Sequence, residues 1–274
     1  MQTVDDLVLA NRRAGVAEVC WSDAQGDPRA LAVVPLEHEN RPALALHWSQ
    51  WSEARELASC PQVAWVLSDR RMAQRGWEPA VGSGRMRLLV DDDGSVFKES
   101  MLDQELHKHP PSRGFADSLV LRRENWWFLP RLILVLDPLV ASPVGERTHP
   151  DRSGVLVVGS PDATVSVDTV AVNVDQGSRM SGEYISCTSL GGLAPMAAGP
   201  ALLLQHDFSV PDLERWGRRI TSGRWDGERL QVLRGSIAEP PSPLIPPIPG
   251  LLERMRRRRE FERDIRRALR AVAR

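Results

Sequence analysis

The chain has 274 residues, of which 42% are hydrophobic and 26% charged, as expected for a globular protein with one large or two smaller domains. Its net charge of −1 argues against nucleic-acid binding by the protein as a whole, and no apolar run reaches the roughly 20 residues of a membrane span. Three scattered cysteines match neither a disulfide framework nor a zinc motif, and no metal site is predicted. Because the N-terminus lacks the features of a secretory signal, we expect a cytoplasmic protein.

Residues 1–148 are expected to form one domain in which short strands alternate with helices. A first helix ends at Gly15, a second begins at Ser52 and ends before Pro61, and a third ends at the pair Pro110-Pro111. The expected strands, in chain order, are 16–23, 28–39, 43–49, 62–69, 82–91 and 126–145.

Residues 149–238 are expected to form a smaller β-rich domain. Strands are predicted over 154–159, 164–174, 182–189 and 201–207, followed by a helix over 210–219 capped by Ser209. The segment "LLLQHDFSVPDLERW" (202–216) resembles "LALHWSQWSEAREL" (44–57), because each has alternating apolar residues, a histidine, a serine cap, an acid and an arginine. This likeness favours a tandem duplication, with His47 and His206 at equivalent places.

The C-terminal segment, 239–274, combines a proline-rich linker with a basic helix. Residues 239–249 hold six prolines, which is typical of a semi-rigid spacer. Beyond them, apolar residues recur at helical spacing and predict an amphipathic helix. Residues 250–274 contain ten arginines and four acids, a net +6, so the rest of the chain carries −7. The helix is expected to pack on the acidic body or on a neighbouring subunit, in preference to lipid or nucleic acid.

Aromatic residues beside basic ones are the main candidates for a binding site. Trp126 and Trp127 precede Arg131, and in an extended chain they would point to opposite faces. One would pack in the core, and the other would face a ligand or a partner subunit, where Trp and Arg are common. Trp48 and Trp51 flank a strand end in the same way, and either could stack on a planar ligand or fill the end of a barrel.

The order of these elements resembles the pyridoxamine 5'-phosphate oxidase-like family. Three stretches carry the resemblance: "AGVAEVCWSDAQGDPRALAVVPL", "ALALHWSQWSEARELASCPQVAWVLSD" and "SGRMRLLVDDDG", which look like that family's first hairpin, its third strand to fourth strand, and its fifth strand. The fold implied is mainly β (α+β): a split β-barrel, with residues 149–238 as a degenerate second copy and the amphipathic helix at the C-terminus.

The resemblance implies an oxidoreductase that binds FMN or a deazaflavin between two barrels, either in a homodimer or in an internal pseudo-dimer. The phosphate would lie at the end of the third strand and the start of the following helix, where free N–H groups favour anions. The residues implied at this cofactor site, together with the aromatic and basic candidates above, are His47, Trp48, Ser49, Trp51, Ser52, Arg55, Trp127 and Arg131.

Two alternatives remain open. The family helix usually reads K-x-R-N-L, whereas this chain has "EAREL", which keeps Arg55 but puts Glu53 and Glu56 where a phosphate would lie. The barrels could therefore be a degenerate module that binds a small-molecule ligand or a protein without a redox cofactor. Haem binding through a histidine, His47 or His206, is the other alternative.

Overall fold

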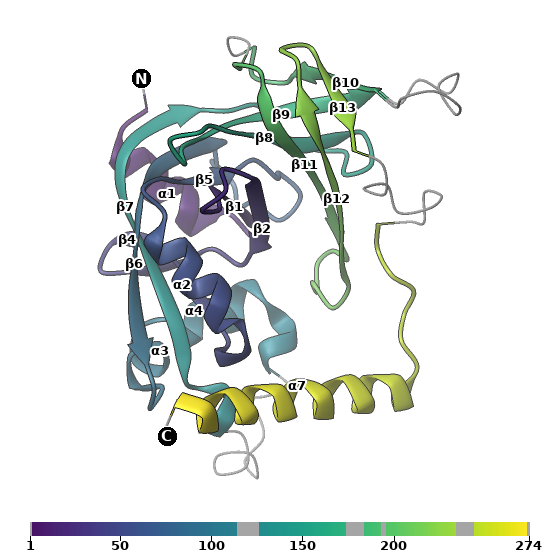
Figure 1. Cartoon of the computed structure of the whole chain (residues 1–274). Coiled ribbons are helices and arrows are strands. Elements are labelled where there is room, and N and C mark those ends of the chain that lie inside the picture. The colour runs from purple at the N-terminus through teal and green to yellow at the C-terminus, as the bar shows by residue number, and fades with distance from the viewer. Residues whose placement is uncertain (1, 114–125, 174–183, 193–195, 234–243, 273–274) are drawn as a thin grey trace.

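The computed structural model describes residues 2–113, 126–173, 184–192, 196–233 and 244–272. Two antiparallel β-systems, one in each half of the chain, pack against each other, and a long C-terminal helix crosses the far end of the first (Figure 1). The expected mainly β fold with a C-terminal amphipathic helix is confirmed. Among the described residues, no helix is both long and apolar enough to cross a membrane.

The first half forms a seven-stranded sheet in the order β2-β1-β5-β6-β7-β4-β3. Its two edge regions, β2 on one side and β4 with β3 on the other, are not paired to each other, so the sheet curls without closing. The strands are β1 (Ala17–Ser22), β2 (Pro28–Val33), β3 (Leu36–His38), β4 (Arg41–Leu46), β5 (Val63–Leu67), β6 (Ala80–Asp91) and β7 (Arg131–Pro143).

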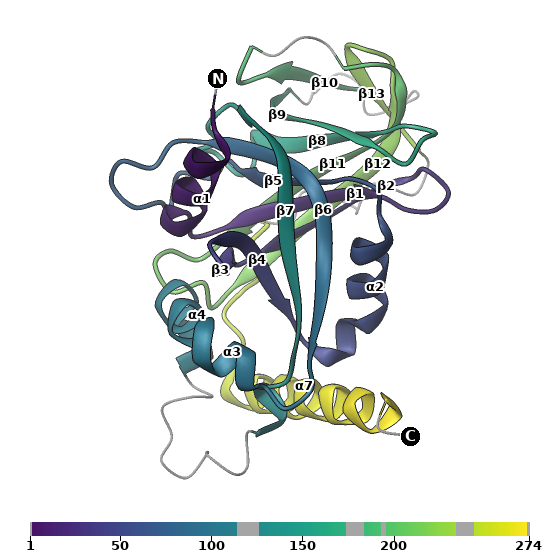
Figure 2. The ribbon, with the colours of Figure 1, turned by 90° about the vertical axis from the view of Figure 1, so that its left-hand side faces the viewer.

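Helices surround this sheet. α1 (Val4–Arg13) begins with a capping box in which Thr3 and Asp6 satisfy each other's backbone N–H groups. The others are α2 (Trp51–Ser59), α3 (Ser95–Ser100) and α4 (Leu102–Lys108), with single 3-10 turns at η1 (Trp48–Gln50), η2 (Pro110–Ser112) and η3 (Trp126–Phe128). The cap expected at Ser52 is wrong, because α2 begins at Trp51 and its N-cap position, Gln50, makes no side-chain cap hydrogen bond. Figure 2 shows α1 and α2 on either side of the sheet.

The second half closes into a six-stranded barrel in the order β10-β13-β12-β11-β8-β9. Numbered from its own first strand, each half pairs its strands in the order 2-1-4-5-6-3, counting β3 and β4 together. The same plan therefore occurs twice in the chain, open in the first copy and closed in the second. The strands are β8 (Ser153–Gly159), β9 (Val165–Asn173), β10 (Tyr184–Ser189), β11 (Gly199–Phe208), β12 (Trp216–Trp225) and β13 (Arg229–Val232).

Contact between the two halves explains why β1 and β5 are buried on both faces. In β1, Val19 and Trp21 point into the first core, whereas Cys20 between them belongs to a core shared with the second barrel. Strand β5 alternates in the same way, with Trp65 in the first core and Val66 in the shared one. The second half contributes residues of β8, β9 and β11 to the shared core, which include Val155, Val157, Val165 and Leu204.

Several expectations for individual elements are wrong. The helix predicted over 210–219 is absent: residues after Ser209 turn, and the chain continues as β12. The alignment of 44–57 with 202–216 is also wrong, because β11 occupies the place of β5 and not that of β4. His47 and His206 are therefore not equivalent. The strand predicted over 28–39 divides into β2 and β3, and the helix predicted before Pro110 divides at Met101.

The C-terminal helix, α7 (Leu251–Val272), packs on the first sheet with one face only. Ile265 is fully buried, and Phe261, Ala268 and Leu269 pack around it against the first core. Their spacing of three or four residues places them on one side of the helix. The arginine-rich face is left at the surface.

Candidate functional site

A cavity of about 370 Å³ lies where the first sheet fails to close. Its walls are the two unpaired edges, with Leu31 and Val33 from β2 and Leu44 and Leu46 from β4. Side chains from distant parts of the chain complete it: His47, Glu105, His109, Phe128, Trp216 and Phe261. Trp216 comes from the second barrel and Phe261 from α7, so all three parts of the protein contribute to this one cavity.

A chain of polar side chains runs along one wall of the cavity. The Ser112 hydroxyl donates to Glu105 Oε1 at 2.6 Å, and His109 Nδ1 lies 2.9 Å from Ser112 Oγ. Since the serine proton goes to Glu105, we assign the proton of His109 to Nδ1, which leaves its Nε2 as an acceptor. Burial lowers the pKa of His109, although Glu105 works in the opposite direction.

His47 is the predicted site residue that lines the cavity. Its ring lies 4.6 Å from the ring of Phe261, edge to face, and 5.6 Å from that of Phe128. Burial, and then the positive charge of Arg131, hold the pKa of His47 well below its usual value. Its Nδ1 is buried and has no hydrogen-bond partner among the described residues, so a ligand in the cavity could satisfy it.

These shifts predict a pH dependence of stability. A histidine that stays neutral in the fold but becomes protonated in the unfolded chain makes stability fall as pH falls below about 6.5. From pH 7.5 to 5.5, His47 should cost about 1.4 kcal/mol of unfolding free energy, measured by urea denaturation at both pH values. In His47→Gln the difference between the two pH values should shrink by that amount, and an unchanged difference would show that His47 is charged in the fold.

Arg131 lies beneath the cavity and is fully buried. Its guanidinium group is enclosed by the rings of Phe97 and Phe128, at 4.2 and 4.1 Å, and its Nη2 is 3.8 Å from Glu105 Oε1. Burial lowers its pKa to about 10, so it remains charged near neutral pH. Glu124, which is near Arg131 in sequence and could pair with it, lies outside the described residues. The aromatic enclosure separates Arg131 from the cavity and from solvent.

The indoles predicted to bind a planar ligand lie in packed surroundings. Residues 126–128 form a 3-10 turn, so the extended arrangement expected for Trp126 and Trp127 is wrong. Trp127 is buried and packs edge-on against Phe128 and Phe261. It also borders a surface hollow beside α7 that Leu269 and Arg270 line.

Trp48, Trp51 and the predicted phosphate-binding residues lie apart from the cavity. Trp48 is buried and stacks on Trp51, with ring centroids 5.5 Å apart and planes 16° from parallel. Ser49, Ser52 and Arg55 are exposed around the start of α2, and none of them lines the cavity. The Ser52 hydroxyl donates to Glu53 at 3.0 Å. The structure thus separates the eight predicted site residues into three groups.

Sequence reasoning missed most of the cavity. Glu105, Ser112 and Trp216 carry no recognisable motif, and His109 is not among the predicted site residues. Helical spacing predicted that Phe261 packs against another part of the protein. It did not predict that Phe261 lines the same cavity as His47, which is about 210 residues away in the sequence. These side chains meet at the opening between β2 and β4, which forms only when the sheet is folded.

A second buried polar group lies where the two halves meet. Glu18 of β1 accepts hydrogen bonds from Arg147 and from His206 Nε2, the latter at 2.6 Å, and Arg147 Nε donates to Ser68 Oγ at 2.8 Å. Burial alone would raise the pKa of Glu18, but Arg147 and His206 outweigh it and hold that pKa below its usual value. His206 is fully buried in this group, which ties the two halves together.

Comparisons with known proteins give only distant similarities. No family model matches the chain, and no curated protein matches it. Among solved structures, a conserved hypothetical protein of Mycobacterium tuberculosis is 10% identical, covering 52% of this chain and 83% of its own, with a TM-score of 0.35. HutZ, the haem storage protein of Vibrio cholerae, is 13% identical over 52% of this chain and 95% of its own, with a TM-score of 0.34.

A pyridoxamine 5'-phosphate oxidase-related, FMN-binding protein of Nostoc punctiforme covers more of the chain. It is 12% identical over 79% of this chain and 90% of its own, with a TM-score of 0.28.

Proposed function

We propose that this chain is a degenerate split-barrel protein that binds a small molecule, without a redox cofactor, in the cavity between β2 and β4. The observation that carries the proposal is the cavity itself, which is built by the first sheet, the second barrel and α7 together. Its volume of about 370 Å³ lies at the small end of the range for ligand pockets. The internal pairing of the two halves would serve as the pseudo-dimer that this site needs.

The lining indicates the kind of ligand. Apolar strand residues and the rings of Phe128, Phe261 and Trp216 suit a flat or compact apolar body. His47 and His109 are both neutral, and each offers a ring nitrogen as an acceptor. The ligand would therefore be an uncharged molecule that carries a hydroxyl or N–H donor.

The residues present do not fit a flavin phosphate or a haem. Arg55, the predicted phosphate ligand, is exposed between two carboxylates of its own helix, and Ser52 already donates to Glu53. No enclosed cradle for a phosphate exists at this point of the described structure. A haem iron on His47 would need the space that the ring of Phe261 occupies at 4.6 Å. We derive no redox step from this geometry.

The test uses N-phenyl-1-naphthylamine, a neutral aromatic amine with one N–H donor, whose fluorescence rises in apolar surroundings. The native protein should bind it, and Ala45→Trp, which puts an indole into the cavity wall, should weaken binding at least tenfold. The matched control is Ala198→Trp, on an exposed loop of the second half, which should bind as the native protein does.

Two results would overturn the proposal. Equal binding by the native protein and Ala45→Trp would place the probe elsewhere. A visible spectrum of the untreated, purified protein with a flavin band or a haem Soret band would instead support the oxidoreductase or haem alternatives.

A further inference from the structure

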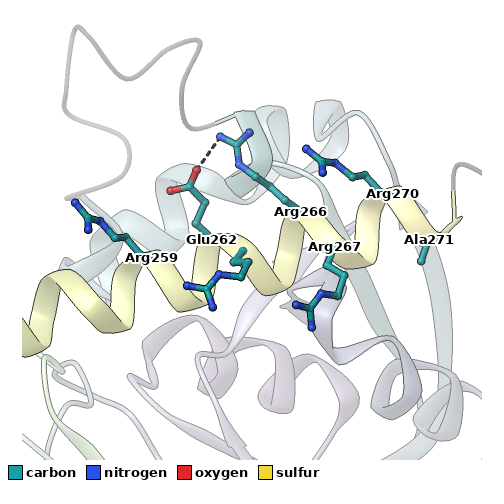
Figure 3. Close-up of a pocket in the computed structure, with 7 residues that line it drawn as sticks. Arg259, Glu262, Arg266, Arg267, Arg270 and Ala271 are labelled. Atoms are coloured by element: carbon teal, nitrogen blue, oxygen red, sulfur yellow. Dashed lines mark ion pairs between the residues drawn. The ribbon is translucent and has the colours of Figure 1, made fainter.

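The outer face of α7 carries a row of five arginines, which we name the arginine ridge: Arg259, Arg263, Arg266, Arg267 and Arg270. Arg259, Arg263 and Arg267 are four residues apart, and Arg266 and Arg270 are also four apart, so the five share one side of the helix, away from the buried Ile265. Eleven steps at 1.5 Å give the ridge a length of about 17 Å. Figure 3 shows Arg259, Arg266 and Arg270 in succession along this side.

Almost no negative charge balances the ridge. Glu262 is the one acidic residue among those lining the hollow of about 730 Å³ that the ridge borders, and it pairs with Arg266 at 2.8 Å (Figure 3). Within the described residues, no ion pair is found for the other four arginines. Arginines four residues apart on the helix repel each other. A bound polyanion would relieve this repulsion.

Besides Glu262, two of the other three acids of α7 pair with arginines that are not part of the ridge. Glu253 pairs with Arg256 and Arg257, at 2.8 and 2.7 Å. Glu260 lies 3.8 Å from Arg256. Two other acids of the helix are thus engaged away from the ridge, whereas Asp264 is exposed and makes no ion pair within the described residues.

We propose that the arginine ridge binds the phosphate backbone of duplex DNA. Guanidinium groups are planar forks that match phosphate oxygens, and their charge supplies sequence-independent affinity. An α-helix about 10–12 Å across fits a major groove about 12 Å wide, whereas the major groove of duplex RNA is too narrow. The ridge has no aromatic residue for stacking on single strands.

The position of α7 makes this binding compatible with a body of charge −7. The helix lies at the end of the molecule opposite β10 and β13, in both views (Figures 1 and 2). The net charge predicts no nucleic-acid binding by the whole chain, but the ridge confines positive charge to one edge. The proposal does not depend on the cavity or on its ligand.

An acidic membrane fits the same face less well. Helices that lie in a membrane surface bury an apolar face in lipid, and here Phe261, Ile265 and Leu269 are packed on the first sheet. Asp92, Asp93 and Glu99 border the hollow on the other side of Arg266 and Arg270, where a flat anionic surface would meet them. Duplex DNA is grooved and not flat, so it can contact the ridge and avoid these carboxylates.

The test is fluorescence anisotropy of a labelled duplex of about 20 base pairs with the full-length protein, at several salt concentrations. Five phosphate contacts predict a slope of about −4.5 in log K against log salt, or about a 500-fold loss of affinity for fourfold more salt. Replacing Arg259, Arg263, Arg267 and Arg270 by Gln, which preserves helix propensity, should reduce the slope to about −1.

A matched control removes the same charge elsewhere. Arg75, Arg85, Arg152 and Arg224 are exposed and lie outside α7, and their joint replacement by Gln should leave the slope near that of the native protein. Circular dichroism checks that both variants are folded. Equal losses in the two variants, no DNA binding by the native protein, or binding of phosphatidylserine vesicles but not of DNA would each overturn the proposal.

Discussion

Replacing Arg147 by methionine is expected to destabilise the protein by about 3–5 kcal/mol, because Glu18 would keep its charge in a buried place without its main partner. His206 alone would then face that carboxylate, at 2.6 Å. Urea denaturation at pH 7 measures the change. Since Glu18 joins the two halves, the unfolding curve should also lose cooperativity, with the second barrel and the first sheet separating as two transitions.

The control for this prediction is a surface ion pair nearby in sequence. Arg70 and Glu146 lie 3.2 Å apart but are both substantially exposed, so Arg70→Met should cost less than about 1 kcal/mol. If Arg147→Met costs no more than Arg70→Met, the buried group does not hold the two halves together, and apolar contacts alone must do so.

Ile265→Asp is expected to release α7 from the first sheet. The substitution removes a fully buried side chain, which typically costs about 2–5 kcal/mol, and adds the cost of burying a carboxylate. A detached α7 would be a short, arginine-rich helix of marginal stability in water. Trypsin should then cleave within 251–272 much faster than in the native protein, while the two β-systems stay folded.

Leu252→Asp is the matched control, because Leu252 is on the same helix but is 83% exposed. It should leave the cleavage rate unchanged. The same pair of variants bears on the cavity: without Phe261 as its cover, N-phenyl-1-naphthylamine should exchange faster in Ile265→Asp than in Leu252→Asp. Equal cleavage rates in the two variants would show that α7 does not depend on Ile265 for docking.

The fold could be predicted from local patterns wherever a continuous apolar run lies between turn residues. Strands β5 and β7 are apolar runs bounded by turn residues, and they form central strands of the sheet as expected. The helix predicted over 210–219 failed because its local signals, a serine cap and a proline, also suit a turn. The chain instead continues as the strand β12, which pairs with β11 along ten residues.

The candidate site could be predicted only in part. His47 was identified because it lies at the end of the third predicted strand, where the family resemblance implies a cofactor phosphate. Glu105 and Trp216 line the same cavity, but their approach depends on where α4 and the second barrel pack, and no spacing in the sequence encodes that. Arg131 was expected beside a ligand, yet the turn at η3 places Phe128 over it.

Both copies of the strand order lie in a single chain, so their sequences can differ from each other. In a pair of identical subunits, each substitution appears on both sides of the axis, so a carboxylate at Glu18 would be repeated in the partner. Here the strand that corresponds to β1 is β8, whose sequence SGVLVVG has no ionisable residue. Each copy can therefore differ: the open one has a cavity between β2 and β4, whereas in the closed one the corresponding strands, β9 and β10, pair with each other.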